Sequence, residues 1–317
     1  KLLLIENIKR YSAKLGFADF GIIPLGKYSK DRERLEKMIF ENRAGNMHYL
    51  SNNMSLREDP KLLLEGACSA MIFIVSYQNI TLQESSLPQI AKYSYGIDYH
   101  YVIKERLSQL CDYIKHDNPQ FIYRIFTDSA PIFERSMAVK AGLGFIGKNT
   151  MFISRSSGIH NLIGVVVSNL ESPYKFEDIE DVTTSSICGD CKKCLENCPT
   201  GALISPFVID AKKCISYNTI ENRKEERVGY THNRVFGCDI CIDVCPWSKK
   251  SIGVIWDELR PLKLENGQLI TSLSCNDWNN MTSGYFKRNF RSSPLLRAGL
   301  KKIQAVLIEQ IKYEKSK

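Results

Sequence analysis

The alternation of apolar and polar residues predicts helices and short strands in turn over the first part of the chain. Segments with apolar residues at helical spacing are predicted to be helices, and short, continuous apolar runs are predicted to be buried strands. The predicted helices span 2–15, 31–40 and 101–115. The predicted strands span 17–24, 67–77, 121–126, 144–154 and 161–168. Pro131 suits the first turn of a further helix that runs to Ala141. We therefore predict one α/β domain over residues 1–180.

Two further parts follow this domain. Residues 181–250 contain most of the cysteines, and residues 251–317 are predicted to form a helical, basic segment that packs on the core. The chain of 317 residues is 44% hydrophobic and 25% charged, which is typical of a soluble globular protein with a substantial core. No apolar run is long enough to cross a membrane, and the apolar start is too short for a signal peptide. We expect a cytoplasmic protein, monomeric by default and without membrane contact.

Eight of the eleven cysteines lie in one window, seven of them in two runs that each end in Cys-Pro and one between the runs. The first run has the spacing Cys-x2-Cys-x2-Cys-x3-Cys-Pro of bacterial ferredoxins. In that motif three thiolates bind one 4Fe-4S cluster and the fourth binds the other cluster. One predicted ligand set is Cys188, Cys191, Cys194 and the distant Cys245. The second run lacks a nearby first cysteine, for which Cys214 is the obvious substitute. The other predicted set is Cys198, Cys214, Cys238 and Cys241.

Zinc sites and disulfide frameworks are the alternative interpretations of dense cysteines. Disulfide frameworks are typical of small secreted domains, which this chain does not resemble. Zinc accounts for four thiolates at a time but not for two interleaved Cys-Pro endings. The spacing therefore favours a ferredoxin-like module with two 4Fe-4S clusters, and a protein that transfers electrons.

The formal net charge of +8 is concentrated near the C-terminus. The basic residues there are Lys287, Arg288, Arg291, Arg297, Lys301, Lys302, Lys312, Lys315 and Lys317. Such a surface can bind phosphates, because neutralising them releases condensed counterions. A solvated helix face is the alternative, and composition alone does not decide between them.

A glycine-rich segment, residues 141–148, has the Gly-x-Gly-x-x-Gly spacing of dinucleotide-binding turns. It follows a predicted helix and enters a strand, which is the reverse of the order that such a site requires. We therefore interpret it as a helix C-cap and tight turn, with close backbone approach to a bound group as the functional alternative.

Several motifs spread along the chain carry a family resemblance. They are residues 57–60 (Arg-Glu-Asp-Pro), 95–100 (Tyr-Gly-Ile-Asp-Tyr-His), 128–131 (Asp-Ser-Ala-Pro), 142–149 (Gly-Leu-Gly-Phe-Ile-Gly-Lys-Asn), 214–217 (Cys-Ile-Ser-Tyr) and 237–241 (Gly-Cys-Asp-Ile-Cys). In this order, and with the eight cysteines, the chain resembles the epoxyqueuosine reductases from its first helix to about Gly299. That family is similar to reductive dehalogenases in joining a corrinoid-binding domain to a two-cluster module.

The resemblance implies an α+β fold in which an α/β sandwich binds cobalamin beside the ferredoxin-like module. It implies reduction of epoxyqueuosine to queuosine at the wobble position of tRNA, with electrons from an external low-potential donor. An RNA substrate favours phosphate binding by the basic tail. Some family members carry a further C-terminal helical-repeat domain, which we expect this chain to lack.

Asp128 occupies the position of the family's proton donor. Opening an epoxide requires an acid for the departing oxygen. The resemblance implies that an apolar pocket and the corrin ring raise the pKa of this carboxyl. Without the resemblance, Asp128 would be interpreted as a helix N-cap.

The cofactor contacts follow from positions in the matched motifs, and the substrate contacts from basic residues near Asp128 and in the C-terminal tail. The expected cofactor contacts are Arg57, Ile97, Asp128, Lys148, Asn149, Ser216, Tyr217 and Asp239. The expected substrate contacts are Arg135, Lys287, Arg288 and Arg291. We expect no protein ligand to cobalt, because Ile103 replaces the glycine of the Asp-x-His-x-x-Gly loop that His100 would require. Tyr99 and His100 are expected to line the pocket or to be satisfied polar groups of the core.

Two alternative functions remain open at this point. The first is a corrinoid-dependent reductase of a small molecule, such as a dehalogenase. The second is an electron-transfer ferredoxin fused to a binding domain.

Overall fold

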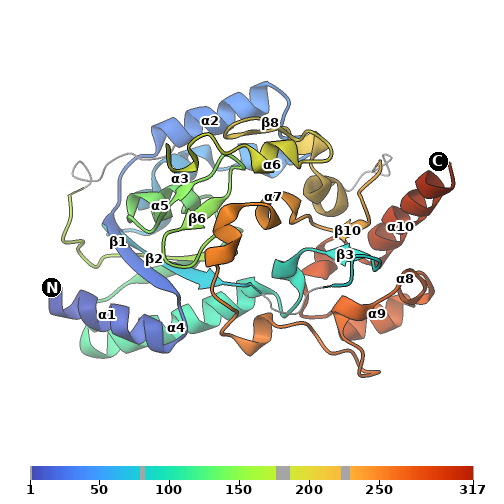
Figure 1. Cartoon of the computed structure of the whole chain (residues 1–317). Helices are drawn as coiled ribbons and strands as arrows, with labels where there is room; N and C mark the ends of the chain where they lie inside the picture. The colour runs from blue at the N-terminus through green and yellow to red at the C-terminus, as the bar shows by residue number, and fades with distance from the viewer. Residues whose placement is uncertain (1, 79–82, 176–185, 223–228, 317) are drawn as a thin grey trace.

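The computed structural model of the chain describes residues 2–78, 83–175, 186–222 and 229–316 (Figure 1). The α-helices are α1 (Leu2–Lys14), α2 (Ser29–Phe40), α3 (Met54–Glu58), α4 (Tyr99–Asp117), α5 (Glu134–Lys140), α6 (Lys193–Glu196), α7 (Ile240–Asp243), α8 (Cys275–Asn280), α9 (Ser283–Asn289) and α10 (Leu300–Lys315). The strands are β1 (Asp19–Pro24), β2 (Ser69–Ser76), β3 (Gln89–Ile90), β4 (Tyr123–Phe126), β5 (Gly144–Ile146), β6 (Phe152–Ser154), β7 (Asn161–Ser168), β8 (Leu203–Ser205), β9 (Val208–Ile209) and β10 (Arg234–Phe236).

A four-stranded sheet with the order β1-β2-β7-β4 forms the centre of the larger lobe, and all of its neighbouring strands are antiparallel. Every residue of β2 is buried, as its continuous apolar sequence predicts. In the register, Phe73 of β2 lies between Phe20 of β1 and Gly164 of β7. Gly164 leaves room for the side chains of Ile103 and Leu107 to pack onto the sheet.

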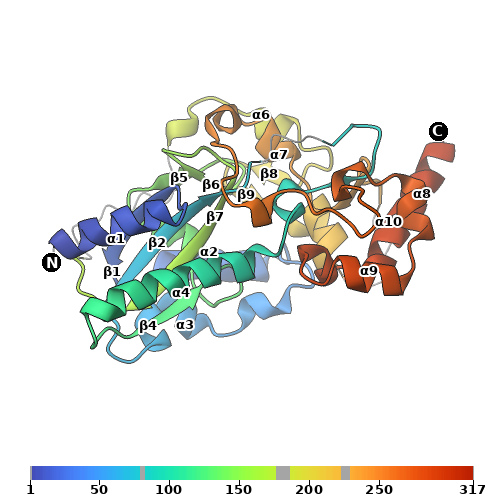
Figure 2. The same ribbon diagram turned by 90° about the horizontal axis from the view of Figure 1, so that it is seen from below.

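Helices cover both faces of this sheet. Seen from below, α1 and α4 lie side by side across one face (Figure 2). Their apolar residues, such as Ile8 and Leu107, form one core with Phe73. On the other face, Met137 and Val139 of α5 pack against Ile72. Outside this layer, α2 has no buried residue, as the charged sequence of that helix predicts.

Two predictions for this lobe need correction. The helix α5 begins at Glu134, not at Pro131, because Asp128 adopts a left-handed conformation with φ 53° and the chain bends before the helix starts. The run 144–154 is not one strand: it is a β5–β6 hairpin in which Thr150, at φ 68°, reverses the chain.

The cysteine-rich and C-terminal parts consist of short elements. A π-helix, η6 (Tyr217–Glu221), separates Cys214 from the second cysteine run. The helices α8, α9 and α10 form a separate core with β10 and β3, centred on Trp278 and Phe236, at the end of the molecule opposite α1 (Figure 1). The mixed helix and strand content is confirmed. The predicted boundary at residues 180 and 181 lies outside the described residues.

Candidate iron–sulfur and active site

The structure brings the eight thiols of the two cysteine runs together in two groups. Cys188, Cys191 and Cys194 neighbour Cys245. Cys198, Cys214 and Cys238 neighbour Cys241. These are the two sets expected from the crossed ferredoxin spacing. The short helices α6 and α7, which follow Cys191 and Cys238, lie against each other and bring the two runs together (Figure 1).

The arrangement of the thiols bears on which metal they suit. All eleven cysteines are free thiols. Within the described ranges, no three His, Cys, Asp or Glu side chains converge closely enough to hold a single metal ion. A tetrahedral zinc site requires such convergence, whereas the thiolates of a cubane each bind a different iron and stand further apart. Two sets of four thiols match the number of ligands that two 4Fe-4S clusters require.

Burial makes five of the eight thiols hard to ionise in the protein alone, because it raises the pKa of Cys194, Cys214, Cys238, Cys241 and Cys245. It raises the pKa of Cys194 and of Cys238 to about 11 and that of Cys241 well above its usual range. Thiolates bind metals, so cluster binding has to supply the positive charge that favours deprotonation.

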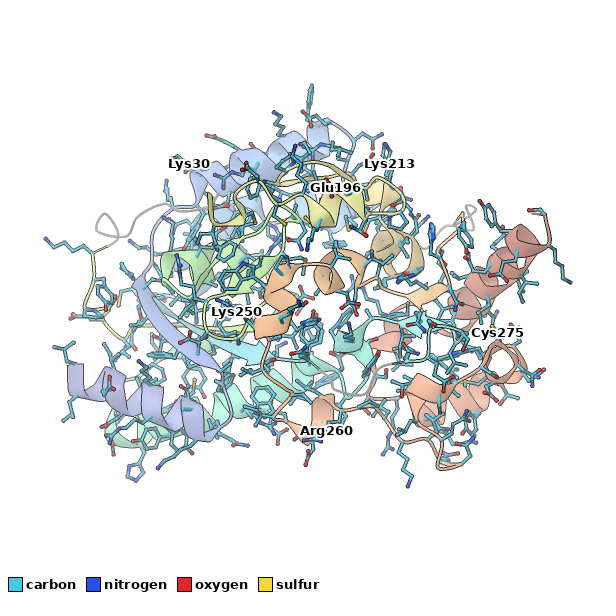
Figure 3. The ribbon with its side chains drawn as sticks, viewed as in Figure 1. Lys30, Glu196, Lys213, Lys250, Arg260 and Cys275 are labelled. Carbon is cyan, nitrogen blue, oxygen red and sulfur yellow. The ribbon has the colours of Figure 1, made fainter. Side chains whose placement is uncertain are left out.

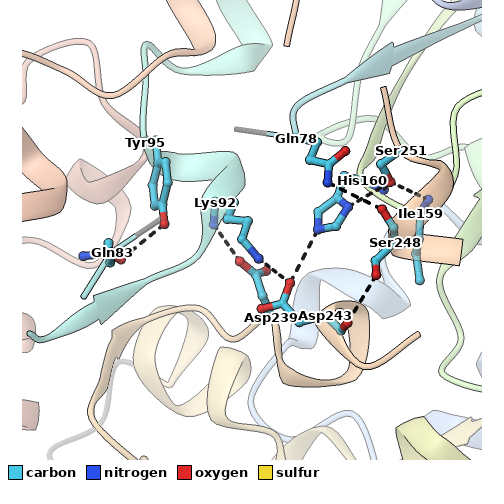
Figure 4. A network of polar contacts seen from close by, with 10 residues as sticks. All are labelled: Gln78, Gln83, Lys92, Tyr95, Ile159, His160, Asp239, Asp243, Ser248 and Ser251. Atoms are coloured by element: carbon cyan, nitrogen blue, oxygen red, sulfur yellow. Dashed lines mark hydrogen bonds and ion pairs between the residues drawn. The ribbon is translucent and has the colours of Figure 1, made fainter. Parts of the chain in front are cut away.

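A polar network connects the larger lobe to the second cysteine run (Figure 4). The backbone N–H of Lys92 donates to Asp239 Oδ2 at 2.7 Å, and its ammonium pairs with Asp243. His160 Nε2 lies 3.5 Å from Asp243 Oδ1, and its Nδ1 lies 2.9 Å from Ser251 Oγ. Although burial acts against ionisation, hydrogen bonds from His160 and Lys92 lower the pKa of Asp243. The network fixes α7, which carries Cys241 and lies between Cys238 and Cys245.

Lys148 and Asn149 lie in the glycine-rich turn, where cofactor contacts were predicted. The Lys148 ammonium donates to the carbonyls of Gly189 and Cys191, the latter at 3.1 Å. Asn149 Nδ2 donates to the Cys241 carbonyl at 3.1 Å. Both side chains hold the cysteine loops and line a hollow with the first set of thiols, and their contact with a bound cofactor stays a prediction. Gly142, at φ 74° directly after α5, fits the predicted helix C-cap.

Asp128 lies at the surface with polar partners. Its side chain is 62% exposed, so protein residues alone do not form the apolar pocket predicted around it. The Tyr99 hydroxyl donates to Asp128 Oδ2, and His100 Nε2 lies 3.7 Å from the same oxygen. His100 Nδ1 lies 2.7 Å from Asp98 Oδ1. Because Asp98 is also the N-cap of α4, the first turn of that helix presents Tyr99 and His100 to Asp128.

Asp128 is not the N-cap of α5. Instead, its own backbone N–H donates to Glu134 Oε1. Burial, reinforced by the negative charge of Asp128, raises the pKa of Glu134 to about 8. Close to Glu134, the guanidinium of Arg57 has a buried Nε with no hydrogen-bond acceptor among the described residues. Burial lowers the pKa of Arg57.

Tyr217 joins the second group of thiols to the larger lobe. Its hydroxyl accepts the backbone N–H of Asn46 at 2.7 Å. The chain can approach this closely because Gly45 has φ 60° and no Cβ, which would lie 2.5 Å from the hydroxyl. The neighbouring Ser216 is half-buried. Ile97 is also half-buried and packs on the core below the sheet.

The predicted substrate contacts lie on two elements, α5 and the region of α9. Arg135 is exposed on α5 and donates to the Thr150 carbonyl. Lys287 and Arg291 are exposed at and just beyond α9, and Arg288 forms a 3.4 Å ion pair with Glu265. Arg297, which was considered only as part of the basic tail, lies near Asp128 and pairs with Glu221 at 2.7 Å.

Sequence reasoning missed Glu134, Tyr49 and Arg297 as neighbours of Asp128. Glu134 had a usable signal, since it lies six residues after Asp128, in the first turn of a helix. The sequence gives no signal for Tyr49 or Arg297, because only the fold brings residues so distant in sequence close to Asp128.

Comparisons with known proteins agree with this arrangement. Residues 57–129 match the family described as "Epoxyqueuosine reductase QueG, DUF1730", and residues 187–248 match the "4Fe-4S double cluster binding domain". The chain is similar to the epoxyqueuosine reductase of Cellulophaga algicola, at 36% identity over 94% of this chain and 95% of the relative. It is similar to that of Leadbetterella byssophila, at 37% identity over 93% and 94%.

Solved structures agree as well. A crystal structure of epoxyqueuosine reductase with an epoxyqueuosine-modified tRNA stem loop matches with a TM-score of 0.84 and 26% identity, over 99% of this chain and 82% of the other. The identity to curated relatives over nearly the full length, together with the grouped thiols and Asp128, shows that the chain belongs to the epoxyqueuosine reductase family.

Proposed function

We propose that the protein reduces epoxyqueuosine to queuosine at the anticodon wobble position of tRNA, using two 4Fe-4S clusters and cobalamin. The observation that carries this proposal is the pairing of two four-cysteine groups with an exposed carboxylate, Asp128, in a chain of this family. The reaction consumes two electrons and two protons, and it converts the epoxide to an alkene and water. The protein must therefore deliver both electrons and protons to one carbon–oxygen centre.

The two groups of thiols hold the clusters. Cys188, Cys191, Cys194 and Cys245 bind one cluster, and Cys198, Cys214, Cys238 and Cys241 bind the other. The cluster that includes Cys214 is the one nearer to the reacting centre. Tyr217, three residues after Cys214, supports this. Its hydroxyl contacts the segment that leads to Tyr49, a neighbour of Asp128.

One observation supports the binding of cobalamin near Asp128. The buried Nε–H of Arg57 has no acceptor among the described side chains and backbone groups, and a corrinoid amide or phosphate oxygen can accept it. When bound, cobalamin supplies the reduced cobalt chemistry that breaks the carbon–oxygen bond. Arg57 and Ile97 are the residues that we assign to hold it, while Lys148 and Asn149 hold the cysteine loops.

Asp128 supplies a proton to the departing oxygen. Its Oδ2 accepts a hydrogen bond from the Tyr99 hydroxyl, which stabilises the carboxylate left after proton transfer. His100 returns the proton as the imidazolium ion: Asp98 accepts the Nδ1–H, and the second proton, on Nε2, faces Asp128 Oδ2, 3.7 Å away. The Glu134 side chain fixes the backbone of Asp128 in its left-handed conformation.

The basic C-terminal part contacts the tRNA backbone. Arg135, Lys287, Arg288 and Arg291 remain the assigned contacts, and Arg297 joins them because it lies beside Asp128. Phosphate contacts of this kind make binding depend on salt. In the part of the chain that the structure describes, no helix is long and apolar enough to cross a membrane.

The function is tested by incubating the iron-loaded protein with cobalamin, a strong reductant and a tRNA carrying epoxyqueuosine. Nucleoside analysis by mass spectrometry should show queuosine formed only when protein, cobalamin and reductant are all present. Unchanged epoxyqueuosine under these conditions contradicts the proposal. Turnover of a halogenated phenol without turnover of the tRNA would identify a small-molecule reductase instead.

A further inference from the structure

One group of thiols lies under a surface hollow. The residues lining it include all four cysteines of the first set, with Lys193, Pro246 and Trp247. Ile187, at the edge of the hollow, is 38% exposed. A cluster in this position lies close to the protein surface, while the second set is connected through Tyr217 to the segment beside Asp128.

Lysines adjoin the segments that line this hollow, and Lys193 is part of the lining itself. Lys192 and Lys193 lie between cysteines of the first run, and Lys249 and Lys250 end the short helix η7 (Pro246–Lys250), which follows Cys245. All four are exposed. The Lys250 ammonium lies 4.3 Å from the centre of the Trp247 ring, so it stays at the rim of the hollow. Figure 3 shows Lys250 on η7 and Glu196 on α6, above it.

The charge at this rim is not neutralised locally. Among the residues that the structure describes, no carboxylate forms an ion pair with Lys192, Lys193 or Lys249. Only Asp190 and Glu196 add exposed negative charge within the two cysteine-flanking segments, 187–198 and 245–250. A surface of this sign attracts an acidic partner and speeds the encounter with it.

We propose that the lysine rim formed by Lys192, Lys193, Lys249 and Lys250 is the docking surface for an acidic, one-electron carrier protein, which reduces the cluster of Cys188, Cys191, Cys194 and Cys245. This rests on the proposed function, because it takes the two clusters as present. In each encounter the reduced carrier loses one electron and the oxidised cluster gains one. Two encounters supply the two electrons that one epoxide requires.

The position of the rim favours a protein carrier over tRNA. The lysines adjoin the segments that line the hollow over the outer set of thiols, where electrons must enter, whereas the substrate must reach Asp128. Asp128 is instead close to Arg297, Arg57 and Tyr49, which come from other segments. The two partners can then bind at the same time.

The test uses iron-loaded, full-length protein and a bacterial flavodoxin with an acidic surface, reduced to its hydroquinone. The variant replaces Lys192, Lys193, Lys249 and Lys250 by Gln. A matched control replaces Lys9, Lys14, Lys61 and Lys115, also exposed, so that net charge changes equally. Stopped-flow absorbance follows cluster reduction without tRNA or cobalamin, and calorimetry measures flavodoxin binding. Reduced methyl viologen serves as a small donor that needs no docking.

At low salt, the rim variant should be reduced by flavodoxin about tenfold or more slowly than the wild type, and should bind it correspondingly weakly. The difference should shrink at high salt, and the rates with methyl viologen should match. An unchanged flavodoxin rate, or an equal loss in the control variant, overturns the proposal. A rim variant that binds tRNA more weakly, but whose clusters flavodoxin reduces at the wild-type rate, also overturns the proposal. Absence of iron–sulfur absorbance in the wild type would instead remove the proposed function itself.

Discussion

At the scale of single residues, the chemistry centres on how Asp128 is held. Its carboxylate is exposed, yet it is not free to turn away, because the Tyr99 hydroxyl donates to its side chain and Glu134 binds its backbone N–H. A left-handed aspartate is strained by roughly 1 kcal/mol, so such contacts are needed to keep it in place.

Replacing Asp128 by Asn tests the proton-donor role. The amide keeps the size and the hydrogen bonding of the side chain but cannot deliver a proton, so turnover of epoxyqueuosine tRNA should fall at least about a hundredfold. Cluster absorbance and tRNA affinity should stay at wild-type values, which checks that the fold is intact. Wild-type turnover in the variant would remove Asp128 from the mechanism.

Glu134 should make stability depend on pH. The unfolded carboxyl ionises near its ordinary pKa of 4.5, whereas the folded one keeps its proton up to about 8. The contribution of Glu134 to the free energy of unfolding is therefore fully present below pH 4.5. It declines as the pH rises to about 8, by at most about 1.4 kcal/mol per pH unit. Gln mimics the protonated carboxyl and escapes this decline.

The measurement is urea unfolding of wild type and of the Glu134→Gln variant across this pH window. The stability advantage of the variant should grow from acidic to basic pH. Glu105→Gln, at an exposed position on α4, controls for the loss of one carboxylate. A difference between Glu134→Gln and wild type that stays constant with pH would contradict the assignment.

At the scale of elements, periodicity predicted the long helices α1, α2 and α4 of the larger lobe and all the strands of the main sheet. This succeeded because β2 and β7 are apolar over most of their length and α4 carries a regular apolar stripe. Periodicity carries no signal for a single left-handed residue. For this reason the late start of α5 after Asp128 and the reversal at Thr150 were not predicted.

The candidate site, too, could be predicted from the sequence only in part. The two thiol sets could be predicted, because the order of the cysteines encodes the crossing. The contact of Lys148 with Gly189 and the pairing of Arg297 with Glu221 could not be, because each depends on segments that only the folded chain brings together.

The β5–β6 hairpin offers a test of element packing. A Cβ added at Gly144 would lie 2.1 Å from the Ile153 carbonyl oxygen in the partner strand. A Cβ at Gly142 would meet nothing within 4 Å, although φ is 74° there. Gly144→Ala should lower the free energy of unfolding by more than about 3 kcal/mol, and Gly142→Ala by about 1 kcal/mol. Equal losses in urea unfolding would show that crowding in the hairpin is relieved.

At the scale of the whole molecule, each set of thiols joins the first cysteine run to the second. Cys214→Ser and Cys194→Ser each remove a ligand from a different set. Each variant should lose roughly half of about eight irons per chain, and the two should keep different paramagnetic resonance signals on reduction. Cys275→Ser, outside both sets, should keep all its iron. Complete retention of iron in Cys214→Ser would contradict the ligand sets.

The crossed grouping of thiols also has a consequence for biosynthesis. Neither set is complete until Cys238 to Cys245 have been made, since each contains members from that late stretch. A nascent chain that has released only its first cysteine run can finish neither centre, and delivery of iron and sulfide has to wait for the ribosome to pass the second. The order of translation therefore makes acquisition of the two inorganic centres nearly simultaneous.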